Sequence, residues 1–321
     1  MKKAYLTAYR MKIISSLIFS VLLTCAAFGQ SLSEINKDAY ALNSDLSSSD
    51  TDLAFLKSEV EGKKVIGLGE LSHGTRELFI QKTRIIKYLI EKCDFRLLSF
   101  ETQEPIMAAI NAFLQTGEGN LKSLMAPMGL YNTEDIYNLF QLIRQFNITN
   151  SKDKVILLGL DDQNYWSNPI TRDKFMAQNL IKSYDLKKAK TIIWTHNVHI
   201  MKDTTSNSMS MGSFLNQHFR NDFYTIGFDG FKGTVSVLND DKFEPHPFQA
   251  KEHTLSTILD QARYPSFYLP FHKNSMINGS SQLIINFYSD WREPKPLKVK
   301  PGLDFDGIIF IRNTSATTKL E

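Results

Sequence analysis

A buried strand that runs straight into a helix, with polar residues at the corner between them, constrains this chain more than any other feature. Residues 65–69 are apolar or glycine and predict a buried strand, and the amphipathic run 75–92 predicts a helix. Glu70 and His73 lie at the corner. Open α/β sheets place their chemistry at such corners, outside the carboxyl ends of the strands. We therefore expect the rest of the chain to bring partner groups here.

Three more strands are predicted, and each ends on polar side chains: residues 95–101 end on Glu101, 154–161 on Asp161, and 191–199 on His196 and His199. Helical runs lie between them, at 104–115, 135–146 and 171–183. This alternation predicts an α/β fold, with a central, mainly parallel sheet flanked by helices and an active site at the carboxyl ends of the strands. We expect one domain over residues 30–321. Weaker signals predict a docking helix from Leu32, Ile35, Ala39 and Leu42, strands at 223–228 and 307–311, and a short helix at 255–262.

The first 29 residues have the pattern of a secretory signal peptide. A basic segment precedes an apolar run, Ile13 to Leu23, that is shorter than the roughly 20 residues needed to span a membrane. We therefore expect an exported protein, periplasmic or secreted, with no transmembrane span in the mature chain. A loose lipoprotein pattern before Cys25 offers lipid anchoring through that residue as an alternative.

The charge of the mature chain gives no sign of a nucleic-acid partner. The formal net charge is +3, but the leader carries four positive charges and no acids, so the mature chain has a charge of −1. No basic stripe follows the leader. We expect a small-molecule partner and no nucleic acid.

The carboxylates and imidazoles at the strand ends suit general acid–base chemistry. A neutral histidine can accept a proton from water near pH 7, and a carboxylate can fix its tautomer and stabilise the imidazolium. The same residue types also suit metal binding, because Glu-x-x-His and His-x-x-His are plausible ligand spacings. On an extended backbone, residues three apart point to opposite faces, so His196 and His199 share a cleft only if the strand ends between them.

Other polar and aromatic residues lie near the predicted cleft. Asp161 and Asp162 are expected to anchor a loop or to lie beside the site. Aromatic residues in predicted loops could shape the pocket or only pack the loops: Tyr131, Tyr165, Trp166 and Phe231.

Several segments, in order, resemble signatures of the erythromycin esterase family. Residues 69–77, Gly-Glu-Leu-Ser-His-Gly-Thr-Arg-Glu, are similar to its Gly-Glu-x-x-His-Gly-Thr-x-Glu motif. Phe100-Glu101, residues 172–179, residues 194–199 and residues 305–310 resemble its later motifs. The resemblance covers about residues 63–313.

The resemblance implies an enzyme that hydrolyses the lactone ester of a macrolide with activated water and needs no metal or other cofactor. His73 would be the general base, Glu70 and Glu101 would orient and polarise it, and His196 and His199 would complete the site. Lys82 and Arg76 would contact the substrate. Lys82 stands where macrolide-hydrolysing members often have Arg, and the interval between Glu101 and residue 172 is short for those members.

Two alternatives stay open at this point. One is a metal-binding protein or metallohydrolase that uses Glu70, His73, Glu101 and His196 as ligands. The other is a non-catalytic protein that holds a ligand of the cell envelope. No Gly-x-Ser-x-Gly motif supplies a serine nucleophile.

Overall fold

A nine-stranded sheet crosses the computed structural model, which describes residues 32–203, 209–240, 242–273 and 277–321. The strand order is β1-β8-β11-β6-β2-β5-β3-β4, and β7 pairs with β6. Neighbours from β11 to β4 are parallel, whereas β1, β7 and β8 pair antiparallel. The strands of this sheet are β1 (Tyr40–Ala41), β2 (Val65–Leu68), β3 (Phe95–Gln103), β4 (Ile156–Asp161), β5 (Lys190–Trp194), β6 (Phe223–Asn239), β7 (Lys242–Gln249), β8 (Ser266–Pro270) and β11 (Gly307–Thr314).

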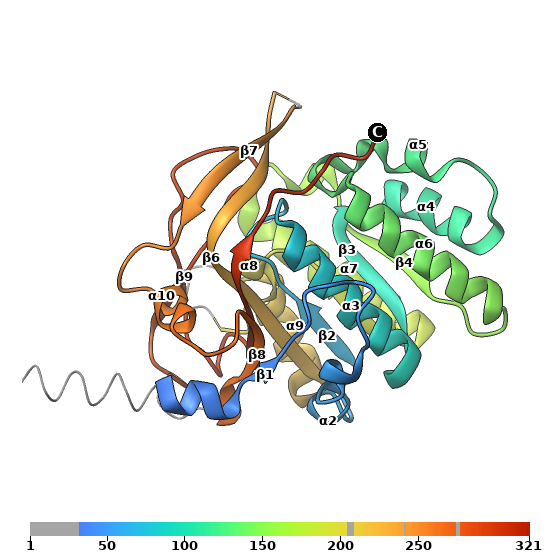
Figure 1. The fold of residues 1–321 in the computed structure, drawn as a ribbon. Helices are drawn as coiled ribbons and strands as arrows, with labels where there is room; N and C mark the ends of the chain where they lie inside the picture. The colour runs from blue at the N-terminus through green and yellow to red at the C-terminus, as the bar shows by residue number, and fades with distance from the viewer. Residues whose placement is uncertain (1–31, 204–208, 241, 274–276) are drawn as a thin grey trace, which may run out of the picture.

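Helices cover both faces of this sheet, with α3 and α6 in front and α7 and α9 behind in Figure 1. The α-helices are α2 (Leu56–Glu59), α3 (Arg76–Cys93), α4 (Glu104–Thr116), α5 (Leu121–Met125), α6 (Glu134–Thr149), α7 (Pro169–Lys187), α8 (Asn197–Ile200), α9 (Met211–Phe219) and α10 (Leu255–Asp260). Residues 32–38 are also helical. Short 3-10 helices are η1 (Thr51–Leu53), η2 (Ala126–Tyr131), η3 (Gln163–Tyr165), η4 (Arg220–Asp222) and η5 (Phe271–Lys273). A separate pair, β9 (Gln282–Ile284) and β10 (Leu297–Val299), is antiparallel.

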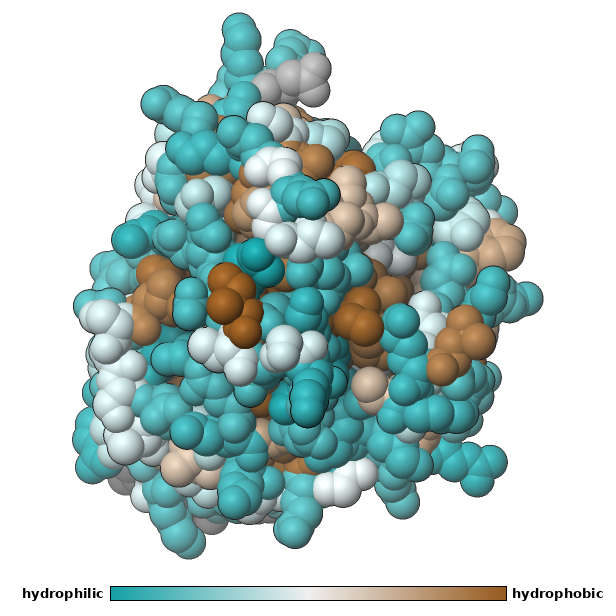
Figure 2. Space-filling model, turned by 90° about the vertical axis from the view of Figure 1, so that its right-hand side faces the viewer, coloured by the Kyte–Doolittle hydropathy of each residue, from teal (hydrophilic) through white to brown (hydrophobic). Residues whose placement is uncertain are grey.

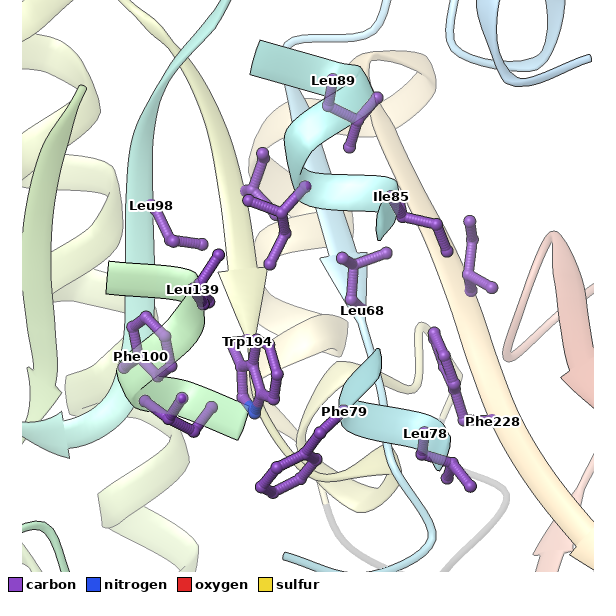
Figure 3. Packing of buried hydrophobic residues seen from close by; sticks show 14 of the residues in the cluster. Leu68, Leu78, Phe79, Ile85, Leu89, Leu98, Phe100, Leu139, Trp194 and Phe228 are labelled. Carbon is purple, nitrogen blue, oxygen red and sulfur yellow. The ribbon is translucent and has the colours of Figure 1, made fainter. Parts of the chain in front are cut away.

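The alternation of side chains along the central strands creates a hydrophobic core on each face. In β5, Ile192 and Trp194 belong to the cluster under α3, whereas Ile193 belongs to the cluster under α7 and α9. Figure 3 shows the first cluster, where Phe79 and other apolar residues of α3 face Trp194 and Phe228 on the sheet. These two cores fix the corner between β2 and α3.

The predicted fold class is confirmed, because the sheet is mostly parallel and flanked by helices. Three details of the prediction were wrong. The first helix stops at residue 38, and Tyr40–Ala41 instead joins the sheet edge as β1. The fourth strand ends at Trp194, before both histidines. The strand predicted at 223–228 continues to Asn239, and its second half extends beyond β2 to pair with β7.

The surface view shows no single large apolar area on the face that it presents. In Figure 2, brown hydrophobic patches are separated by hydrophilic residues. Within the described ranges, no helix has the length and apolarity that a membrane crossing requires. The predicted signal peptide at residues 1–29, including Cys25, lies outside the described residues.

Candidate active site

Two glycines allow the backbone to turn closely around the corner after β2. A Cβ on Gly69 would lie 2.1 Å from the side-chain oxygen of Asn197, and a Cβ on Gly74 would lie 1.9 Å from the carbonyl oxygen of Ser236. Only glycine fits such close approaches. Between these glycines, the chain places Glu70 and His73 at the carboxyl end of β2.

Glu70 holds one nitrogen of His73 and leaves the other available. Glu70 is fully buried, and its Oε1 accepts a hydrogen bond from His73 Nδ1 at 2.6 Å. The hydroxyl of Tyr131 lies 2.9 Å from the same Oε1 and 2.9 Å from Nδ1. His73 Nε2 has no hydrogen-bond partner among the residues described by the structure. The carboxylate therefore selects the tautomer whose lone pair is on Nε2.

Lys82 binds the far side of Glu70 and does not reach the pocket. Its Nζ donates to Glu70 Oε2 at 2.7 Å and lies 4.1 Å from the ring centroid of Trp194. Burial lowers the pKa of Lys82 to about 8, although Glu70 opposes this shift. Burial also opposes the charge on Glu70, but Lys82 and His73 hold its pKa below the usual value. The direct substrate contact predicted for Lys82 does not fit a side chain with no exposed surface.

Arg76, the other predicted substrate contact, lies away from these groups. It is the first residue of α3, its side chain is exposed, and its Nε lies 3.6 Å from Asp135 Oδ1. Its position on the outer surface of the helix explains why the structure does not bring it into the cleft.

Glu101, near the carboxyl end of β3, is saturated with hydrogen bonds. Its Oε1 accepts from Arg172 at 2.9 Å and lies 3.1 Å from His199 Nε2. Its Oε2 accepts from the Thr195 hydroxyl at 2.7 Å and from the backbone N–H of His196 at 3.1 Å. Burial opposes ionisation, but His199 and Arg172 hold the pKa of Glu101 well below its usual value.

His199 is a half-buried cation between two carboxylates. Its Nδ1 donates to Asp173 at 2.7 Å, and its Nε2 faces Glu101. Burial disfavours the charge, but Asp173 and Glu101 outweigh it and raise the pKa of His199 to about 10. Arg172 lies 3.3 Å away, and its guanidinium also binds Asp161. The carboxylates therefore hold two cations side by side.

His196 is engaged by the backbone at both ring nitrogens. Its Nε2 donates to the carbonyl of Leu71 at 3.1 Å, and its Nδ1 accepts from the N–H of Val198 at 3.4 Å, capping α8. Burial and the neighbouring His73 lower its pKa to about 3. Its ring packs edge-on against that of His73, with centroids 5.3 Å apart. In this geometry His196 is a neutral neighbour of His73 with no free nitrogen.

A pocket of about 230 Å³ connects these groups to the surface. Its polar lining includes His73, Glu101, Tyr131, Asp161 and Arg172, and its remaining lining residues are Thr102, Gln103, Ile106, Pro127, Met128, Gly129, Leu130, Trp166, Leu238 and Ser289. A wider recess of about 680 Å³ lies near the start of β6, but it contains none of the predicted site residues. The pocket of about 230 Å³ is the candidate site because its lining contains His73 and Glu101, although the other recess is larger.

The structure thus brings together five predicted residues, Glu70, His73, Glu101, His196 and His199. Sequence reasoning assigned no role to Arg172 or Asp173, which come from the start of α7, and it treated Tyr131 of η2 only as a residue of the pocket wall. The motif-like stretch at 172–179 was the one signal that could have drawn attention to Arg172.

The same geometry bears on the metal-binding alternative. Within the described ranges, no group of three or more His, Cys, Asp or Glu side chains is placed to hold a metal ion. The two central carboxylates are directed at cations of the protein itself, Lys82 for Glu70 and Arg172 for Glu101.

Comparisons with known proteins agree with one another. A sequence model of a family described as erythromycin esterase matches residues 90–169 and 162–314, two ranges that lie beyond the motif at 69–77. "Putative hydrolase YbfO" of Bacillus subtilis (strain 168) is 31% identical over 162 residues. That match covers 50% of this chain and only 34% of YbfO, so the matched part is about a third of the relative's length.

Solved structures show the same fold. A Bacillus cereus protein superposes with a TM-score of 0.82 at 18% identity, covering 92% of this chain and 99% of that one. A mutant of the erythromycin esterase EreC superposes with a TM-score of 0.65 at 13% identity, covering 88% of this chain and 98% of that one. At these identities the likeness concerns the fold.

Proposed function

The chain belongs to the erythromycin esterase family, and we propose that it hydrolyses a carboxylic ester with water activated by His73. One observation carries the proposal: buried Glu70 holds His73 Nδ1 at 2.6 Å, while Nε2 remains available at the pocket. A histidine oriented in this way by a carboxylate is a suitable general base near neutral pH.

In the proposed reaction, His73 Nε2 accepts a proton from water as the water oxygen bonds to the ester carbonyl carbon. The carbonyl oxygen becomes an oxyanion, and Glu70 stabilises the imidazolium that forms. When the intermediate collapses, the bond from carbon to the alkoxide oxygen breaks and the leaving oxygen takes the proton from Nε2. The products are an alcohol and a carboxylic acid.

We assign the oxyanion to Arg172 rather than to His196. Both ring nitrogens of His196 are bonded to the backbone, whereas Arg172 lines the pocket beside His73. Its Nε and NH2 bind Asp161 and Glu101, and NH1 contacts only His199 among the described residues. His199 is protonated on both ring nitrogens and cannot accept from NH1, so the NH1 hydrogens remain to donate to the oxyanion.

Lys82, Glu101 and His199 support this machinery without a direct step in it. Lys82 keeps Glu70 ionised, and Glu101 with His199 fixes the guanidinium of Arg172. The lactone ester of a macrolide is a candidate substrate for the family's chemistry. The pocket of about 230 Å³ is smaller than the roughly 300–1,000 Å³ typical of sites that enclose drug-sized ligands, so only the ester-bearing edge of a macrolactone would enter.

The test is mass spectrometry of erythromycin and of simple neutral esters after incubation with the wild-type chain, His73→Ala and His218→Ala. His218 is an exposed histidine of α9 and serves as the control. We expect the wild type and His218→Ala to add one water to at least one ester. His73→Ala should be slower by about 10²–10⁴-fold. Equal rates in His73→Ala would refute the assigned base, and no hydrolysis of any ester would refute the function.

A further inference from the structure

The charged groups of the candidate pocket bind one another, and Arg172 NH1, which has no carboxylate partner among the described residues, is assigned to the oxyanion. Glu101 receives three hydrogen bonds and pairs with the His199 cation, and Asp161 accepts from Arg172, Trp166 and the N–H of Asp162. The proposed oxyanion needs the hydrogens of Arg172 NH1. Burying an ionised group without its own partner is costly, so this lining disfavours a charged substituent near the ester.

The remaining lining of the pocket is rich in apolar side chains. It includes Ile106 of α4, Met128 and Leu130 of η2, and Leu238 of β6. These residues come from three separate elements that meet beside His73. A substrate group in contact with them would lose its hydration without gaining hydrogen bonds, so they favour an apolar group.

Trp166 adds a large aromatic surface that is held in place and still exposed. Its indole N–H donates to Asp161 Oδ2 at 2.9 Å, and the residue is 55% exposed although it lines the pocket. The indole edge is therefore anchored by the same carboxylate that holds Arg172. Exposed tryptophan at a pocket is a common contact for a ligand, because it offers a large area at a small entropic cost.

We propose that Trp166 is the specificity-determining residue of this pocket, and that the substrate is a neutral ester bearing a small apolar group packed against the indole. This inference rests on the proposed ester hydrolysis and names its substrate class. The volume of about 230 Å³ sets the upper limit on the group that enters.

The first experiment uses two series of neutral esters, one with acyl chains lengthened from acetyl on a fixed alcohol and one with alcohols lengthened on a fixed acetyl group. In one of the series, kcat/KM of the wild type should rise by about fourfold for each added methylene until the pocket is full. Trp166→Ala should remove this dependence and raise KM for the longer esters about tenfold.

Trp291→Ala is the matched control, because Trp291 is also exposed but stacks on His246 and does not line this pocket. It should keep the chain-length dependence. Acetylated monosaccharides and esters that carry a carboxylate should be poor substrates. A preference for either, or the same chain-length dependence in Trp166→Ala and wild type, would overturn the proposal while leaving ester hydrolysis intact. No hydrolysis of any ester by wild type would instead count against the proposed function.

A second measurement does not depend on turnover. A neutral amide with the shape of the best ester should quench tryptophan fluorescence on binding, and Trp166→Phe should abolish the quench. Trp291→Phe should keep it. Quenching that survives in Trp166→Phe and disappears in Trp291→Phe would place the ligand elsewhere and overturn the proposal.

Discussion

Glu70 is a carboxylate with no exposed surface that is stabilised from three directions. His73 Nδ1 and the Tyr131 hydroxyl bind one oxygen, and Lys82 binds the other. A carboxylate buried in this way is tolerated only because both of its oxygens have hydrogen-bond partners. The position of the candidate base is therefore tied to the pairing of a second, buried residue.

Replacing Lys82 by methionine should destabilise the protein strongly. The substitution leaves Glu70 buried without its cation, which typically costs about 3–5 kcal/mol in free energy of unfolding. Urea denaturation at pH 7 measures the loss. The double variant Glu70→Gln/Lys82→Met should recover most of it, because the charge is also removed. Equal stability of the single variant and wild type would show that the pair contributes little.

At the scale of single residues, the sequence predicted the site residues that follow strands and missed the roles of those that lie elsewhere. Glu70, His73 and Glu101 follow apolar strands, and the rule about strand ends found them. Tyr131 and Arg172 come from η2 and α7, and neither residue follows a predicted strand. Their role depends on how those elements pack over the sheet edge, which no local pattern specifies.

At the scale of elements, the one-turn helix α8, which follows β5, forms hydrogen bonds to β6 and to the residue after β2 beside the site. The side chain of Asn197 donates to the carbonyl of Phe228 at 2.7 Å and accepts from its N–H at 3.0 Å. The N–H of Asn197 donates to the carbonyl of Glu70 at 2.9 Å. These bonds join the end of β2 to β6 at the point where β5 turns into α8.

A methyl group at Gly69 should disrupt the hydrogen bonds between the Asn197 side chain and Phe228. The Cβ of Gly69→Ala would overlap the Asn197 side-chain oxygen, so the substitution should cost about 1–3 kcal/mol. In an Asn197→Ala background the clashing atoms are absent, and the same substitution should cost less than half as much. A double-mutant cycle by urea denaturation measures the difference. Additive effects of the two substitutions would contradict the proposed clash.

The strands predicted from apolar runs belong to the parallel part of the sheet, whereas the antiparallel strands β1 and β7 contain no such run. Four of the strands predicted from apolar runs, β2, β3, β4 and β5, lie together at one end of the sheet. Strand β7 has proline at Pro245 and Pro247 and alternates between exposed and half-buried residues, so it lacks an apolar run. The two residues of β1 are too few to create a pattern at all.

At the scale of the whole molecule, one buried acid connects distant parts of the second half of the chain. Asp229 of β6 has no exposed surface and accepts from the Ser256 hydroxyl of α10 at 2.6 Å and from the N–H of Ile285 at 3.1 Å. Burial raises the pKa of Asp229 to about 7. No cation lies near enough to oppose this shift, so the folded protein favours the protonated form below about pH 7.

Stability should therefore fall as the pH rises through the range in which Asp229 ionises. In the unfolded chain its pKa is near 3.8, so the folded state holds an extra proton between about pH 4 and 7. Asp229→Asn should gain free energy of unfolding relative to wild type by roughly 2–4 kcal/mol between pH 4 and 8, with most of the gain reached by pH 7. Urea denaturation of both proteins at pH 5 and pH 8 measures this gain. A constant difference at the two pH values would contradict it.

The seventeen residues of β6 serve two purposes along one strand. Its first half lies at the centre of the sheet between β2 and β11, and from Thr234 onward it pairs with β7 and carries Leu238 to the pocket. A change at the outer end of the β6–β7 hairpin would therefore reshape the entrance, whereas Val235 and Ser236, nearer its base, are buried and belong to the folded core. For an engineer, the same division makes this hairpin the place to diversify in a library aimed at new substrates.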